Sequence, residues 1–202
     1  MKLVLVRHGY TVGNDQGLYT GWSNTILSRK GIEDLKQYRK EYDYPKTDRY
    51  YTSDLVRTID TFHLLYGEET PIKESTFAFR EIGFGDYEDL KWNEIDDVPY
   101  NDMYILNKPH VNGETISQVT LRLFGKLTQV FSDMSKNGED SVTIVCHSGV
   151  IKTILIFLKS LPFSDFKEIA TPNGLGYILD IDFDIENNFL TLNRYEPIPK
   201  KK

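Results

Sequence analysis

Hydrophobic and polar residues alternate between two patterns along the chain: short apolar runs and longer amphipathic stretches. The apolar runs predict strands over 2–6, 49–52, 141–147, 177–183 and 189–195. The amphipathic stretches predict helices over about 28–42, 54–66, 115–134 and 150–159, with a short helix over 92–95. Residues 76–112 carry little other periodicity. The pattern is clearest in 115–134, where apolar residues recur at spacings of three and four: Ile116, Val119, Leu123, Leu127, Val130 and Met134.

The order of these elements predicts a single α/β domain over residues 1–202. We expect a three-layer α/β/α sandwich with a mostly parallel central sheet and helices on both faces. The first strand is apolar throughout, as strands buried on both faces are. In the 54–66 helix, Ile59, Phe62 and Leu65 form a candidate apolar face. The residues from about 196 to 202, which end in three lysines, are predicted to be a frayed basic tail.

Composition narrows the class of protein. The chain has 202 residues, of which 40% are hydrophobic and 27% charged, as in ordinary globular domains. A net charge of −6 argues against general nucleic-acid binding, because proteins that bind nucleic acids usually have more basic than acidic residues. The single cysteine, Cys146, cannot form an internal disulfide and fits a reducing compartment. With no signal-peptide pattern and no apolar run of membrane-spanning length, we expect a cytoplasmic protein with no membrane partner.

Two of the predicted strands end in histidine. VLVRHG places His8 after the first strand, and TIVCHSG places His147 after the third. Ligands of open α/β sheets bind outside the carboxyl ends of the strands, so we expect both histidines to face one crevice. The charge of Arg7 disfavours a proton on the neighbouring His8. The helix that begins near Ser148–Gly149 offers free backbone N–H groups to an anion.

Three other chemistries fit less well. A divalent metal is unattractive because Arg7 stands beside one of the candidate ligands. A cysteine-dependent phosphatase needs an arginine six residues after its nucleophile, where this chain has Lys152, and Cys146 is expected to pack in the core. The Asp180–Ile181–Asp182 string does not continue as an aspartate-nucleophile motif, and its aspartates are predicted to lie on a solvated strand face.

Two further residues suit an anion site. Arg57 lies early in a predicted helix, and its planar guanidinium can grip phosphate oxygens in pairs. Glu81 lies among glycines and aromatic residues, where the pKa of a carboxyl can rise enough for it to act as an acid. Taken singly, each also fits an ordinary solvated residue.

Six stretches in fixed order resemble the histidine phosphatase superfamily, in the branch with cofactor-dependent phosphoglycerate mutases and small-molecule phosphatases such as α-ribazole phosphatase-like and broad-specificity members. The resemblance covers residues 1–195, and six motifs in register make it specific although each alone is weak. The stretches are RHG at 7–9 with Thr11 and Asn14, GLYTGWSNTILSRKG at 17–31, SDLVRTIDT at 53–61, REIGFGDYE at 80–88, NGET at 112–115 and VCHSG at 145–149.

The resemblance implies a phosphoglycerate mutase-like fold and a metal-independent reaction without a cofactor. It implies that His8 is the nucleophile and becomes a phosphohistidine, and that Glu81 gives a proton to the leaving oxygen. The residues implied to bind the phosphate or substrate are Arg7, Asn14, Thr20, Gly21, Arg57 and His147.

The implied activity is hydrolysis of small phosphorylated metabolites. Phosphoglycerate mutase is the alternative within the enzyme class, and a catalytically weak phospho-ligand-binding protein is the alternative outside it. The intact catalytic set weighs against the second alternative. The sequence leaves the substrate and the oligomeric state open.

The chain departs from the family pattern at two positions near the expected pocket rim. Ile26 stands where the family usually has proline. Asp89 stands where the family often has a glycine directly after a Trp/Tyr–Glu pair. Trp22, Tyr87 and Trp92 either line that rim or pack in the core.

The stretch after the Glu81 motif bears on the reaction. The mutases that this chain resembles carry a long basic insertion there, whereas here residues 86–112 hold more acids than bases, with two lysines, Lys91 and Lys108. A weakly basic, open site should admit water to a phosphohistidine. The sequence therefore predicts hydrolysis rather than isomerisation.

Overall fold

The computed structural model describes residues 1–94 and 106–202. Its centre is a six-stranded sheet in the order β3-β2-β4-β1-β5-β6. The strands are β1 (Lys2–Arg7), β2 (Arg49–Ser53), β3 (Glu74–Thr76), β4 (Ser141–Cys146), β5 (Gly176–Asp184) and β6 (Phe189–Pro197). Strands β3, β2, β4 and β1 run parallel, while β5 is antiparallel to β1 and β6 is antiparallel to β5. The expectation of a mostly parallel sheet is confirmed.

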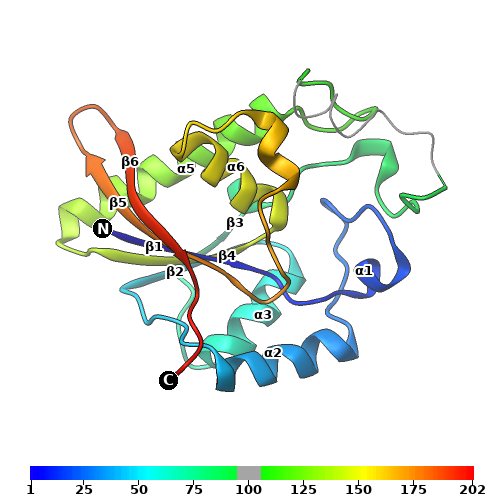
Figure 1. Ribbon diagram of the computed structural model, residues 1–202, viewed down its shortest axis with the longest axis horizontal. Coiled ribbons are helices and arrows are strands. Elements are labelled where there is room, and N and C mark those ends of the chain that lie inside the picture. The colour runs from blue at the N-terminus through cyan, green and yellow to red at the C-terminus, as the bar shows by residue number, and fades with distance from the viewer. Residues whose placement is uncertain (95–105) are drawn as a thin grey trace.

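Helices cover both faces of this sheet (Figure 1). Helices α5 (Ile116–Asn137) and α6 (Ser148–Leu158) lie on one face, and α2 (Arg29–Glu41) and α3 (Val56–Tyr66) lie on the other. The short helix α1 (Val12–Gln16) follows β1. Three 3₁₀ helices, η1 (Phe77–Phe79), η2 (Gly85–Tyr87) and η3 (Phe163–Lys167), complete the described elements. The three layers match the predicted α/β/α sandwich.

Strand β1 shows how the sequence builds these layers. Its residues alternate between two apolar clusters, Leu3 and Leu5 packing on the α5–α6 side and Val4 and Val6 on the α2–α3 side. All four are at most 1% exposed. Successive side chains of a strand point to opposite faces, so an entirely apolar strand belongs at the centre of a covered sheet.

Several predicted boundaries shift in the structure. Helix α3 begins at Val56 rather than 54, because Asp54 pairs with Arg80 and Leu55 keeps an extended backbone. Helix α6 begins at Ser148, directly after the extended residue His147. Strand β3 was not predicted, because its three residues are polar and form no apolar run.

The predicted apolar face of α3 is partly wrong. Phe62 and Leu65 are buried, whereas Ile59 is only partly buried. Polar residues occupy the rest of the buried face: Arg57, Thr58 and Thr61. The inner side of this helix therefore faces polar surroundings near its beginning.

Two predictions for short segments also change. The predicted helix over 92–95 is a turn at Trp92–Asn93 and a bend at Glu94, and residue 95 lies outside the described residues. The prediction of a frayed tail over 196–202 is wrong. Ile198 is buried at 4% exposure, and the backbone N–H of Lys201 donates to the carbonyl of Glu41 at the end of α2 (2.7 Å).

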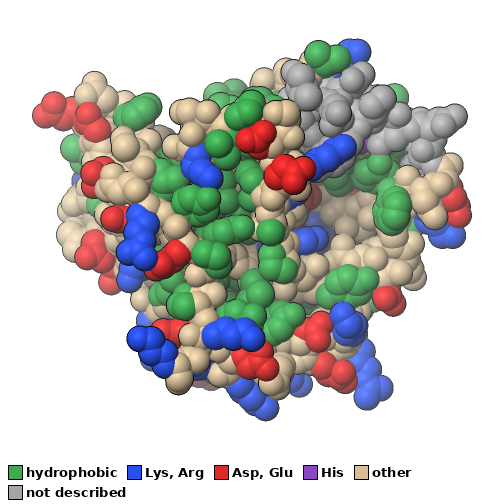
Figure 2. Space-filling model, viewed as in Figure 1, with side chains coloured by type: hydrophobic (Ala, Val, Ile, Leu, Met, Phe, Trp, Pro, Cys, Tyr) green, Lys and Arg blue, Asp and Glu red, His purple; other side chains and the backbone are tan. Residues whose placement is uncertain are grey.

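The surface shows no strong bias of charge on the face drawn in Figure 2, where acidic and basic side chains are interspersed. Asp180 and Asp182 are exposed along β5, as predicted. Within the residues that the structure describes, no helix is long and apolar enough to cross a membrane.

Candidate active site

The parallel pairing of β1 with β4 brings the two histidines together. Arg7 pairs with Cys146 in the register, and the next residue of each strand is a histidine. The backbone N–H of His8 donates to the carbonyl of Cys146 (3.0 Å). The ring centroids of His8 and His147 are 5.1 Å apart. The fold therefore brings the two histidines at these strand ends close together.

His8 carries its reactive lone pair at Nε2. Its Nδ1 lies 2.7 Å from the carbonyl of Gly9, and a carbonyl only accepts hydrogen bonds, so Nδ1 holds the proton. Burial lowers the pKa of His8 well below its ordinary value, and the charges of Arg57 and Arg7 lower it further. A neutral imidazole with a bare Nε2 is a competent nucleophile at neutral pH.

Arg57 is a fully buried cation whose guanidinium is held by backbone carbonyls. It donates to Ser23 (2.8 Å), to Gly21 (2.8 Å) and to Thr20 (3.1 Å). Burial lowers its pKa to about 10, so it remains charged at neutral pH. Its Nε has no hydrogen-bond partner among the described residues.

Arg7 adds a second cation beside His8. It donates to the carbonyl of Thr171 (2.6 Å), while its Nε has no partner among the described residues. In the described part of the chain, no carboxylate lies within ion-pair distance of Arg7 or Arg57. One fully buried and one partly buried guanidinium group, both without a carboxylate partner, favour a site for an anion.

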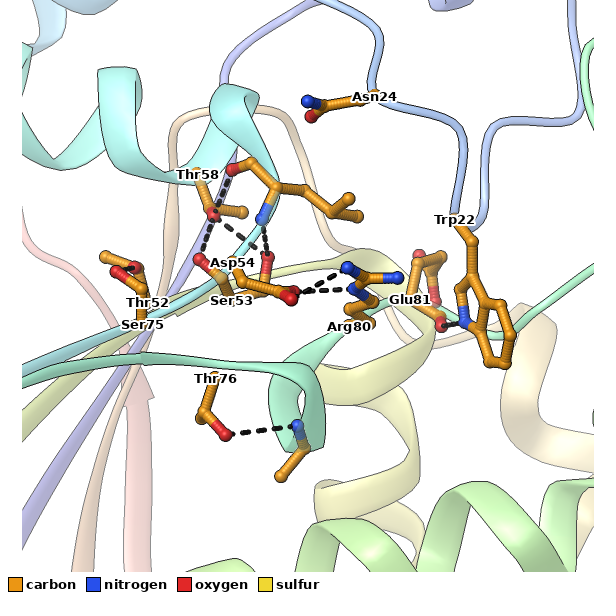
Figure 3. Close-up of polar contacts among 12 residues, drawn as sticks. Trp22, Asn24, Thr52, Ser53, Asp54, Thr58, Ser75, Thr76, Arg80 and Glu81 are labelled. Atoms are coloured by element: carbon orange, nitrogen blue, oxygen red, sulfur yellow. Dashed lines mark hydrogen bonds and ion pairs between the residues drawn. The ribbon is translucent and has the colours of Figure 1, made fainter.

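Glu81 faces the beginning of α6. Its Oε2 accepts from the backbone N–H of Gly149 (3.0 Å), and its Oε1 accepts from the N–H of Ile82 (3.0 Å). Its own carbonyl accepts from Trp22 Nε1 (3.1 Å) and from Arg122 (2.9 Å). Figure 3 shows the first of these two bonds, with Trp22 beside Glu81. The backbone of Glu81 is thus held while its carboxyl group meets the helix N-terminus.

His147 is fully buried at the start of α6. Its Nε2 lies 2.8 Å from the hydroxyl of Ser53 on β2, and its Nδ1 has no hydrogen-bond partner among the described residues. Burial lowers its pKa well below the ordinary value, and the charge of Arg57 adds to that effect. An unpartnered buried nitrogen beside two cations is positioned to meet a ligand atom.

The three remaining candidates are Asn14, Thr20 and Gly21, and their hydrogen bonds hold other parts of the site in place. Asn14 Oδ1 accepts from the backbone N–H of Thr11 in the capping box of α1, and Asn173 Nδ2 lies 3.5 Å from it. The carbonyls of Thr20 and Gly21 are occupied by Arg57. These two residues therefore orient Arg57 through their backbone.

The aromatic residues of the expected rim differ in position. Trp22 is 38% exposed and lies beside Glu81 through its indole N–H. Tyr87 packs against the ring of His110, with centroids 4.7 Å apart. Trp92 is 59% exposed, and its backbone N–H donates a hydrogen bond to the carbonyl of Gly17, the residue after α1. Of these three residues, Trp22 forms a hydrogen bond with a candidate catalytic residue.

One departure from the family pattern has a visible backbone reason. Asp89 has a φ of 63°, in the left-handed region that glycine adopts most easily, which accounts for the glycine that the family pattern leads us to expect there. Its N–H donates to the carbonyl of Tyr19 (2.8 Å), which keeps the loop closed. Ile26 is exposed, and its carbonyl accepts from Val12.

Sequence reasoning missed residues that hold the candidates in place. Ser53 bonds to His147, and Thr171 bonds to Arg7. Asn173 donates to the carbonyl of His8 (3.2 Å). The carboxylate of Glu88 accepts hydrogen bonds from the backbone N–H groups of Gly21, Trp22 and Ser23. Ser53 and Glu88 lie inside the SDLVRTIDT and REIGFGDYE stretches, which is the one signal that could have found them.

Cys146 is fully buried in the core, as predicted, and burial raises the pKa of its thiol. It is therefore unsuited to act as a nucleophile. Among the residues described, no cluster of three or more His, Cys, Asp or Glu side chains has the geometry to hold a metal ion.

Comparisons with known proteins identify the family of the chain. The family model described as "Histidine phosphatase superfamily (branch 1)" matches residues 3–192. The adenosylcobalamin/alpha-ribazole phosphatase of Salmonella typhimurium is 30% identical over 189 residues, covering 90% of this chain and 91% of that protein. The 2,3-bisphosphoglycerate-dependent phosphoglycerate mutase of Blochmanniella floridana is 26% identical, covering 92% and 95%. The crystal structure of the alpha-ribazole phosphatase from Shigella flexneri superposes with a TM-score of 0.77 at 25% identity, covering 96% and 95%.

Proposed function

Because the chain belongs to branch 1 of the histidine phosphatase superfamily, we propose that it hydrolyses small phosphorylated metabolites through a phosphohistidine at His8. The observation that carries this proposal is the neutral His8, with its bare Nε2 near the fully buried Arg57 and the partly buried Arg7, neither of which has a carboxylate within ion-pair distance in the described structure. The arrangement suits a nucleophile that attacks a phosphoryl group.

The reaction has two steps. In the first, the lone pair of His8 Nε2 attacks phosphorus, and the bond from phosphorus to the ester oxygen breaks with its electron pair on that oxygen. Glu81 passes a proton to the departing oxygen. In the second step, Glu81 takes a proton from water as the water oxygen attacks phosphorus, and the bond to Nε2 breaks to release inorganic phosphate and neutral His8.

The surrounding groups stabilise the charge on the transferring phosphoryl group. In this proposal Arg7, Arg57 and His147 bind its three equatorial oxygens, over which charge spreads in the transition state. Asn14 completes the same pocket. The guanidinium groups supply positive charge that a metal ion would supply elsewhere, so we propose that the reaction needs no divalent metal.

Hydrolysis is favoured over isomerisation by the stretch that follows the Glu81 motif. Of its described lysines, Lys91 is exposed and paired with Glu94 (2.9 Å). A mutase needs additional positive charge for a second acidic group on its ligand, and it must keep water from the phosphoenzyme. The similarity to the Blochmanniella mutase makes isomerisation the second candidate.

A direct comparison of the two reactions tests the proposal. Purified enzyme is supplied with 3-phosphoglycerate and catalytic 2,3-bisphosphoglycerate, and the formation of 2-phosphoglycerate is compared with phosphate release. A panel of phosphomonoesters, including alpha-ribazole 5′-phosphate, is assayed in parallel, with a chelator present in one series. We expect phosphate release from at least one monoester to exceed isomerisation, with no loss on chelation. Isomerisation that outpaces hydrolysis of every ester would make the protein a mutase.

A further inference from the structure

A chain of hydroxyl groups leads from α3 to His147. The Ser53 hydroxyl lies 2.8 Å from His147 Nε2 and 2.9 Å from the hydroxyl of Thr58. Figure 3 shows the contacts among Ser53, Thr58 and the adjoining backbone at the end of β2. All three residues are fully buried, so these hydrogen bonds have little competition from solvent.

The direction of each hydrogen bond follows from what surrounds Thr58. Its hydroxyl oxygen lies 2.9 Å from the carbonyl of Ser53 and 2.8 Å from the carbonyl of Leu55. Carbonyl oxygens only accept, so the single proton of Thr58 is directed to them. In the contact between the two hydroxyls, Thr58 must then accept and Ser53 must donate.

This leaves Ser53 with one possible role toward His147. The only proton of the Ser53 hydroxyl is used on Thr58, so its oxygen accepts from His147 Nε2–H. A neutral imidazole carries one proton, and His147 is therefore the Nε2–H tautomer with a bare lone pair on Nδ1. That Nδ1 is the buried atom without a partner among the described residues.

A bare Nδ1 cannot donate to a phosphoryl oxygen, which also only accepts. The charged and titratable groups around His147 are Arg57 on α3, Arg7 at the end of β1, His8 directly after β1, Arg122 on α5, and Glu81, whose carboxylate accepts from the N–H of Gly149 at the start of α6. Burial and the charges of the three arginines lower the pKa of His147 and so favour its neutral form. A bound dianion reverses the local field, because an opposite charge close to an imidazole favours its protonated form.

We propose that Ser53 is a positioning residue that holds neutral His147 as its Nε2–H tautomer, and that His147 takes up one proton at Nδ1 when a phosphate dianion binds. The resulting imidazolium donates Nδ1–H to the phosphoryl group and Nε2–H to Ser53. The inference rests on the proposed function, because it takes the site around His8 as a phosphate pocket.

Nitrogen-15 NMR of the free protein tests the tautomer without any turnover. The His147 signals are identified by their loss in His147→Gln. We expect a protonated Nε2 and an unprotonated Nδ1 at pH 7. In Ser53→Ala this preference should weaken, whereas Thr52→Val should keep it, because the neighbouring Thr52 hydroxyl pairs with Ser75 instead (2.8 Å). A protonated Nδ1 in the free wild-type protein would overturn the proposal, whether or not the variants fold.

Calorimetry with inorganic phosphate tests the proton uptake. Binding is measured at pH 8 in buffers of different ionisation enthalpy, which gives the number of protons taken up. We expect close to one in the wild type, and binding to Ser53→Ala weaker by at least about tenfold. Binding without proton uptake contradicts this inference alone. Absence of any phosphate binding contradicts the proposed function and the uptake together, while the tautomer remains decided by NMR.

Discussion

Replacing Glu88 by glutamine should loosen the loop that holds Arg57. The two oxygens of Glu88 accept from four backbone N–H groups. Oε1 accepts from Trp22 (2.8 Å) and Phe84 (3.0 Å), while Oε2 accepts from Gly21 (2.9 Å) and Ser23 (3.1 Å). Glutamine keeps one acceptor oxygen and places an NH₂ group at the other position. Whichever way the amide turns, two backbone donors then face another donor.

The loss in the free energy of unfolding follows from the number of backbone donors left without an acceptor. Each donor left without an acceptor costs about 1–3 kcal/mol when buried. Glu88 is only partly buried, so water restores part of the loss. We therefore expect Glu88→Gln to reduce the free energy of unfolding by about 2–4 kcal/mol, which is a large part of the stability of a typical domain.

The same change should lower activity. The loop bound by Glu88 provides the three carbonyls that orient Arg57, from Thr20, Gly21 and Ser23. With the loop free to move, Arg57 loses its fixed position toward the phosphoryl group. We expect kcat/KM for p-nitrophenyl phosphate to fall by at least about tenfold, since small displacements of positioning groups are costly in catalysis.

Urea unfolding and initial rates measure the two effects on the same preparations. The matched control is Glu33→Gln on α2, where an exposed carboxylate pairs with Arg29 (3.1 Å). That variant should lose less than about 1 kcal/mol and no activity. An unchanged unfolding midpoint in Glu88→Gln would refute the hydrogen-bond count. Lost stability with full activity would refute the link from the loop to Arg57.

Three further predictions concern the catalytic residues. Glu81→Gln should slow alkyl phosphates by about 10²–10⁴-fold and p-nitrophenyl phosphate much less, because only a basic leaving oxygen needs a proton; equal slowing would indicate a binding role. Gly149→Ala should reduce kcat at least about tenfold, since its Cβ would clash with Glu81 Oε1, whereas Gly125→Ala, whose Cβ meets nothing within 4 Å, should not. The lowered pKa values of His8 and His147 mean that, below about pH 6.5, the unfolded chain binds protons that the folded protein does not. Stability measured by urea unfolding should therefore fall as the pH drops below 6.5, by up to about 1.4 kcal/mol per pH unit for each histidine, and His147→Gln should reduce that slope.

The sequence predicts the two histidines of the site well because their positions follow from periodicity. A run of consecutive apolar residues predicts a buried strand, and the carboxyl end of a parallel strand is where an α/β sheet binds ligands. His8 and His147 needed no further information to be placed together. Arg57 and Glu81 are different, since an isolated arginine on a helix or glutamate in a loop is usually solvated. Their assignment depended on the resemblance of the surrounding motifs.

The supporting hydrogen bonds could not be predicted. Ser53 and His147 are 94 positions apart, and Glu88 and Gly21 are 67 apart. No local pattern states which distant partner a hydroxyl or carboxylate will meet. Strand β3 was missed for a related reason, because an edge strand of three polar residues forms through pairing with β2 rather than through its own apolar pattern. The docked tail depends in the same way on Ile198 reaching the core.

Trapping the phosphoenzyme tests the central claim most directly. The enzyme is mixed with a rapidly hydrolysed phosphomonoester, quenched in base within the first turnovers, digested and analysed by mass spectrometry under conditions that preserve phosphohistidine. The account predicts base-stable, acid-labile phosphate on the peptide that carries His8, and neither phosphate nor turnover in His8→Ala. Phosphate on another residue, or near-normal turnover by His8→Ala, would contradict it.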